Sequence, residues 1–95
     1  MNRTLTSVFA GMFRKQGYDV KEYPMFDVVE FENFVLEGMI QFDKILKEHR
    51  VRWKCKRGYA ILDVPITPGY ASVSFKKVGD MFNFLQRRLI WKKQR

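Results

Sequence analysis

Residues 50–56 read RVRWKCK, the most regular pattern of charge in the chain. Basic residues alternate strictly with Val51, Trp53 and Cys55. Successive side chains of a β-strand point to opposite faces, so the alternation predicts a strand with one basic and one apolar face. The basic face carries four cations, Arg50, Arg52, Lys54 and Lys56. We expect the apolar face to lie on the core.

The residues after this strand predict two further strands separated by turns. Arg57-Gly58 is typical of a tight turn, and it leads into an apolar segment at 59–64. Residues 67–70 read TPGY, which places Pro and Gly at the centre of a second turn. Apolar and polar residues then alternate again at 71–76. Together the three strands predict an antiparallel meander.

Apolar residues recur at helical spacing in three segments, 5–16, 33–49 and 81–91. Thr4 is placed to cap the first helix, and Gly17 is placed to end it in a left-handed turn. The second segment predicts a helix despite the conformational cost of a central glycine. Gly79-Asp80 precedes the third segment and provides its expected cap.

Residues 18–31 leave two alternatives open. The alternation from Phe26 to Phe31 favours a short edge strand at 26–31, whereas Asp27 and Glu30 could form the capping box of a helix. We favour the strand. The predicted fold class is therefore α+β: a small single domain spanning residues 1–95, with a three-stranded antiparallel meander, this optional fourth edge strand and two or three helices. Residues 1–4 and 92–95 are expected to fray.

The composition excludes several classes of protein. Hydrophobic residues make up 46% of the 95 residues, which is too apolar for a disordered chain. One cysteine and one histidine cannot by themselves form a disulfide or a four-ligand zinc site. No apolar stretch approaches the roughly 20 residues that cross a bilayer, so we expect no integral membrane association. We also expect no catalytic residues, no metal and no cofactor, and a cytoplasmic location, in host cytoplasm if the protein is viral.

The net charge of +8 is distributed unevenly along the chain. Residues 19–48 carry eight acidic and three basic residues, whereas residues 49–95 carry twelve basic and two acidic ones. A separation this large steers a polyanion toward one face of a protein. The predicted helix at 33–49 carries Glu37, Asp43 and Glu48, and it would neutralise the basic strand if it packed across that strand.

These features together predict a small nucleic-acid-binding protein that contacts phosphates. Four cations on one strand face exceed what the protection of a sheet edge requires, and the C-terminal helix adds further basic residues. The sequence does not distinguish DNA from RNA. The expected binding residues are Arg50, Arg52, Lys54, Lys56, Arg57, Lys76, Lys77, Arg87, Arg88, Lys92 and Lys93.

A second hypothesis uses the same charges differently. A basic face also fits an acidic protein surface, so the chain could be a phage-like inhibitor or adaptor, of the kind carried by mobile elements. Such a protein would bind an acidic or nucleic-acid-binding surface of a larger partner. Alternatively, the same cations have no ligand: those of the strand form a solvated sheet face, and those of the last helix complement its dipole.

Two short resemblances to RNA-binding families are also present. Residues 57–60, RGYA, resemble the first half of the first ribonucleoprotein motif of RNA-recognition domains, but Ile61 stands where that family has a second aromatic residue. The predicted order of elements in 33–95 is similar to that of double-stranded-RNA-binding domains, and Lys76-Lys77 is similar to their paired lysines. The other signatures of both families are missing, so we infer membership of neither.

Overall fold

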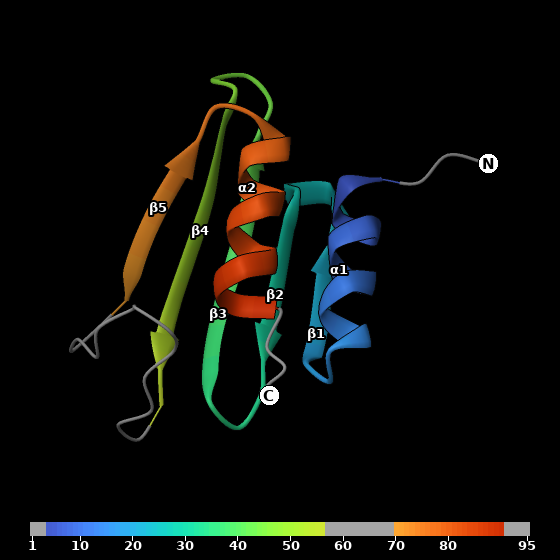
Figure 1. Ribbon diagram of the computed structural model, residues 1–95. Helices are drawn as coiled ribbons and strands as arrows, with labels where there is room; N and C mark the ends of the chain where they lie inside the picture. Colours follow the sequence, from blue (N-terminus) through green and yellow to red (C-terminus); the bar gives the residue numbers. More distant parts are fainter. Residues whose placement is uncertain (1–3, 57–69, 91–95) are drawn as a thin grey trace.

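The computed structural model describes residues 4–56 and 70–90, which form a five-stranded antiparallel sheet and two helices (Figure 1). The strands follow one another in space as they do in the chain: β1 (Asp19–Tyr23), β2 (Val28–Glu32), β3 (Leu36–Asp43), β4 (Glu48–Cys55) and β5 (Ala71–Phe75). The helices are α1 (Leu5–Lys15) and α2 (Val78–Leu85). The predicted α+β class is confirmed, but with a larger sheet than the sequence indicated.

Both helices cover the same face of the sheet (Figure 1). The helix α1 packs on β1 and β2, and α2 packs on β4 and β5. Two short segments complete the chain path: a 3-10 turn, η1 (Pro24–Phe26), between β1 and β2, and a π-helical turn, η2 (Gln86–Ile90), after α2. No helix in residues 4–56 and 70–90 is long and apolar enough to cross a membrane. We call the sheet face opposite the helices the open face.

The prediction for the first helix is confirmed at both ends. Thr4 Oγ1 accepts a hydrogen bond from the Ser7 amide at 3.1 Å, which satisfies a free donor of the first turn. Gly17 has φ of +90° and lets the chain reverse, and the Tyr18 amide then bonds to the Phe13 carbonyl at 3.1 Å. Phe9 and Phe13 are buried, as the helical spacing predicts.

The prediction of a helix at 33–49 is wrong, because these residues form β3, a turn and the start of β4. Asn33 Oδ1 accepts hydrogen bonds from the amides of Val35 and Leu36, and this turn starts β3. Asp43 Oδ1 similarly holds the amides of the next turn, where Lys47 has φ of +53°. Short polar side chains of this kind compete with the hydrogen bonds of a helix, and here they stabilise turns instead.

The predicted edge strand exists, but it is not at the edge. Residues 28–32 form β2, which lies between β1 and β3. The sequence analysis missed β1, a five-residue strand without a strong apolar alternation. The last predicted strand is confirmed as β5, which pairs directly with β4 rather than with an intervening strand of a meander. The turn at Arg57-Gly58, the strand at 59–64 and nearly all of the turn at 67–70 lie outside the described residues.

Aromatic rings join the helices to the sheet. The Phe13 ring on α1 stacks on Phe31 of β2, with centroids 4.1 Å apart and planes 8° from parallel. Phe9 contacts Phe42 of β3 at 5.3 Å. On the same face of the sheet, the ring centroids of Trp53 on β4 and Phe84 on α2 lie 5.5 Å apart. Contacts of this geometry stabilise a core beyond the area that they bury. They hold the helices on one face of the sheet.

Gly38 makes the close packing at the centre of the sheet possible. It lies on β3 between Phe31 on β2 and Trp53 on β4. A Cβ added at Gly38 would lie 2.4 Å from the Arg52 carbonyl oxygen and 2.7 Å from the Phe31 ring. The Phe31 ring occupies the space that a side chain at this position would need. The glycine that seemed a cost in a helix is thus a requirement of the sheet.

We predict that Gly38→Ala destabilises the protein by about 1–3 kcal/mol, because the added methyl group overpacks a filled region. Urea denaturation of both proteins measures this loss. Gly11→Ala is the matched control: the position is inside α1, and the added Cβ would have no atom within 4 Å apart from its chain neighbours and the backbone of its own helix. Its free energy of unfolding should rise by about 0.5–1 kcal/mol. Equal effects of the two substitutions would contradict the close packing at Gly38.

Candidate functional site

Three cations form a row on the open face along β4. Arg50, Arg52 and Lys54 are exposed, whereas Val51 and Trp53 between them are buried under the helices. The predicted alternation of the strand is therefore confirmed. Residues two apart in a strand lie roughly 6.8 Å from each other, so the row extends over about 14 Å. We call these three residues the basic row.

The basic row lies inside the sheet rather than at its edge. On one side β5 places Ser74 opposite Arg50 and Ser72 opposite Arg52. Hydroxyl groups of this kind add hydrogen-bond donors beside the cations. On the other side β3 places Gln41, Met39 and Glu37 opposite Arg50, Arg52 and Lys54. Since β5 pairs with β4, the protection of an exposed strand edge does not explain the cations.

Two of the three cations have no ionic partner in the part of the chain that the structure describes. Arg50 forms a long ion pair with Glu48, with Nη2 and Oε1 3.8 Å apart. Neither Arg52 nor Lys54 forms an ion pair with any residue of 4–56 or 70–90.

The acidic residues do not cover the basic row, but they limit its extent. The expected acidic helix is absent, and Glu37 lies in the sheet, on the strand next to Lys54. Farther across the open face, β2 carries Glu30 and Glu32, and β1 carries Asp19 opposite Glu32. The open face thus has a basic side at β4 and, at β1 and β2, an acidic side that also contains Lys21, opposite Glu30. A polyanion can approach the first side more closely than the second.

The structure separates the other predicted binding residues into four groups. Lys56 follows β4, and its Nζ donates to the Glu32 carboxylate in an ion pair. Lys76 and Lys77 are exposed between β5 and α2, at the end of the sheet where Arg50 lies. Arg87 and Arg88 are in η2, on the helix-covered side. Arg57, Lys92 and Lys93 lie outside the described residues.

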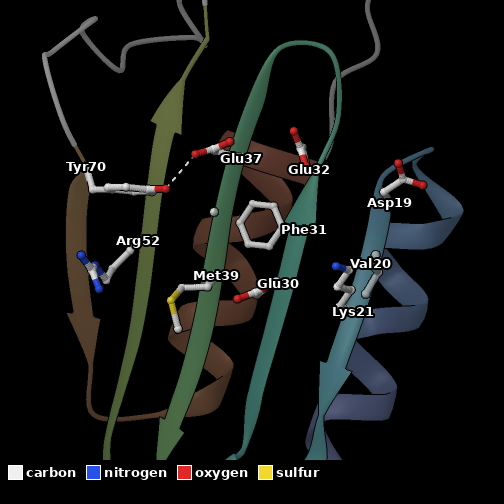
Figure 2. Close-up of a pocket in the computed structure, with 11 residues that line it drawn as sticks. Asp19, Val20, Lys21, Glu30, Phe31, Glu32, Glu37, Met39, Arg52 and Tyr70 are labelled. Carbon is white, nitrogen blue, oxygen red and sulfur yellow. Dashed lines mark hydrogen bonds between the residues drawn. The ribbon is translucent and has the colours of Figure 1, made fainter.

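A groove of about 560 Å³ lies on the open face beside the basic row (Figure 2). Arg52 and Tyr70 line one side, Lys21 of β1 lines the opposite side, and Met39 and Glu37 lie between them. The further residues that contribute to the lining are Asp19, Val20, Glu30, Phe31, Glu32 and Gly38. The groove therefore joins the basic and the acidic sides of the open face.

Tyr70 lines the groove but was not among the predicted binding residues, and the sequence placed it in the turn at 67–70. Its hydroxyl donates to Glu37 Oε2 at 2.7 Å, and the Arg52 guanidinium carbon lies 5.3 Å from its ring centroid. The hydrogen bond to Glu37, together with partial burial, raises the pKa of the Tyr70 hydroxyl above its ordinary value of 10.0. Two neighbours thus hold in place an aromatic ring that is 49% exposed. Tyr70 is two residues before Ser72, and residues two apart in an extended chain share a face. This spacing could have placed Tyr70 on the same face as Arg52.

The positions of His49 and Cys55 do not suit a base and its nucleophile. His49 and Cys55 both lie on β4, six residues apart, which is about 20 Å along a strand. That separation is too large for a base and a nucleophile to exchange a proton directly. No group of three or more His, Cys, Asp or Glu side chains in 4–56 and 70–90 could hold a metal ion.

A second exposed feature lies at the ends of two hairpins. Met25 and Phe26, between β1 and β2, are 91% and 70% exposed, and Ile45 and Leu46, between β3 and β4, are 91% and 65% exposed. An ion pair between Asp27 and Lys44, with 3.4 Å between the charged atoms, joins the two turns. Apolar side chains gathered in this way are uncommon on a monomeric surface. We call these four residues the apolar tips.

Comparison with known proteins identifies no relative. No family model, no curated protein and no solved structure matches the chain. A fold by itself does not define a function, so the site has to carry the functional argument.

We predict a large loss of stability for one substitution in β4 and almost none for substitutions of its neighbours. Trp53→Ala should lower the free energy of unfolding by roughly 3–5 kcal/mol, because it removes a buried ring that contacts α2. The double substitution Arg52→Gln with Lys54→Gln should change it by less than about 1 kcal/mol, because both side chains are exposed. Urea denaturation tests both. A large loss in the double variant would mean that the basic row has a structural role.

Proposed function

We propose that the protein binds nucleic acid through the basic row on its open face. The observation that carries the proposal is the row itself: three exposed cations at strand spacing, two of them without an ionic partner in residues 4–56 and 70–90. Negative phosphates are the ligands that such a row suits best, because a nucleic-acid backbone also carries its charges in a line.

Neighbouring residues support contact with phosphates. Ser72 and Ser74 flank the basic row, and hydroxyl groups commonly donate to phosphate oxygens. Lys76 and Lys77 extend the positive charge beyond Arg50. We therefore expect five cations to contribute, Arg50, Arg52, Lys54, Lys76 and Lys77. Lys56 is excluded by its ion pair with Glu32, and Arg87 and Arg88 are excluded by their position on the other side of the sheet.

The dependence of affinity on salt tests this proposal. Five neutralised phosphates predict that the logarithm of the affinity falls with the logarithm of the salt concentration, with a slope of roughly −3.5 for a single strand. Fluorescence polarisation of a labelled oligonucleotide at several salt concentrations measures the slope. Arg52→Gln with Lys54→Gln should weaken binding and bring the slope to about −2, since two contacts are lost.

The control removes the same charge from the other side of the molecule. Lys15 and Arg87 are exposed on α1 and η2, which lie on the helix-covered side. Lys15→Gln with Arg87→Gln should leave the slope close to that of the unmodified protein. Equal losses in the two double variants would show that net charge, and not the basic row, governs binding. No binding at low salt would contradict the proposal.

The apolar tips favour a second candidate function, that of an adaptor or inhibitor that binds a larger protein. Met25 and Ile45 are more exposed than apolar residues usually are, and burial of each side chain in an interface would contribute about 1.5–3 kcal/mol. The two candidates predict different contact surfaces, because the tips lie at the hairpin ends and the basic row lies on the sheet face. We rank nucleic-acid binding first because the basic row has charge as well as exposure.

A further inference from the structure

We propose that the groove beside the basic row binds single-stranded nucleic acid and selects guanine through the Glu37 carboxylate. This inference rests on the proposed function and adds to it the form of the nucleic acid and the base that is recognised.

The charge division of the open face favours a single strand. The strands β4 and β2 are two positions apart in the sheet, which is about 10 Å. A duplex presents two phosphate backbones across a groove of about 12 Å. If one backbone lay on the basic row, the other would therefore lie over β2 and its neighbour β1, where three carboxylates, of Asp19, Glu30 and Glu32, outnumber the two cations Lys21 and Lys56. A single strand has one backbone and avoids these carboxylates.

The groove also provides a place for an unstacked base. Proteins that bind single strands stack bases on aromatic side chains while cations hold the backbone. Tyr70 is held by its hydrogen bond to Glu37 and by the Arg52 guanidinium, so little conformational freedom of its ring is left to lose on binding. Met39, opposite Arg52, adds an apolar surface at the centre of the groove (Figure 2).

Glu37 gives the groove a preference among the bases. An ionised carboxylate only accepts hydrogen bonds, and its two oxygens together offer about four acceptor positions. Tyr70 uses one of them, on Oε2. Guanine presents two adjacent N–H donors, from N1 and the 2-amino group, on its Watson–Crick edge. Thymine and uracil present one N–H between two carbonyl oxygens, which a carboxylate repels. Adenine and cytosine each place an amino group beside a ring nitrogen that is itself an acceptor.

The positions of Glu37 and Lys54 fit a single nucleotide. The two residues are directly opposite each other on β3 and β4, where paired Cα atoms lie about 4.5–5.5 Å apart. A phosphate on Lys54 and its neighbour Arg52 therefore leaves the attached base within reach of the adjacent strand. Recognition of the base and contact with the backbone thus use neighbouring positions of one face.

Inosine tests the proposal, because it lacks only the 2-amino group of guanosine. Three labelled oligonucleotides are compared by fluorescence polarisation: oligothymidine, an oligothymidine with isolated guanosines, and the same sequence with inosine at each of those positions. The guanosines are kept apart so that quadruplexes do not form. We expect the oligonucleotide with guanosine to bind about tenfold more tightly than the one with inosine, since the lost hydrogen bond is made to a charged group. A duplex of the same sequence should bind more weakly than the single strand.

Glu37→Gln should bring the guanosine-to-inosine ratio of affinities close to one. Glu48→Gln is the control, because it removes the same charge from the open face outside the groove lining. It should keep the ratio at about ten. Melting temperatures of both variants verify that they are folded, and the comparison of the three oligonucleotides needs no variant.

The possible outcomes separate this inference from the function on which it rests. Equal, salt-dependent binding of the three oligonucleotides would overturn guanine selection and leave the proposed function standing. Binding of the duplex as tightly as of the single strand would overturn the single-strand part. No binding of any oligonucleotide at low salt would overturn the proposed function itself.

Discussion

The structure depends on one constraint: both helices cover the same face of the sheet, so buried and exposed side chains must alternate along β4. Trp53 must be buried against α2, and strand geometry then turns Arg52 and Lys54 to the opposite face. A shift of one residue in the register of β4 would bury the cations and expose the ring. Core packing and the placement of charge are therefore two consequences of the same alternation. The missing side chain at Gly38 leaves the space that the Phe31 ring and the Arg52 carbonyl of β4 occupy beside β3.

Local sequence signals predicted an element correctly where all of them indicated the same structure. The first helix has an apolar stripe, a cap at Thr4 and a terminator at Gly17, and all three agree. Residues 33–49 carry two competing patterns. The helical spacing of their apolar residues led to the wrong prediction, although Asn33 and Asp43, ten residues apart, are typical turn residues. Strand pairing between distant segments, which the sequence does not show, decided between the patterns.

The site was predictable in part for the same reason. The basic row follows from the alternation within one strand, so the sequence was sufficient to find Arg50, Arg52 and Lys54. The groove depends on which strands are neighbours. Tyr70 and Glu37 meet because β3, β4 and β5 are adjacent, and this order could not be derived while Glu37 was assigned to a helix. The sequence therefore revealed the part of the site that lies within one strand and did not reveal the contacts between different strands.

The proposed function places ligand binding on the open face beside β4. Amide chemical-shift mapping by NMR, with a short single-stranded oligonucleotide added in steps, tests it most directly. The largest shift changes should fall on Arg52, Lys54 and Ser72, with little change at Gly11 in α1. Changes concentrated at the apolar tips or in α2, with β4 unaffected, would contradict it.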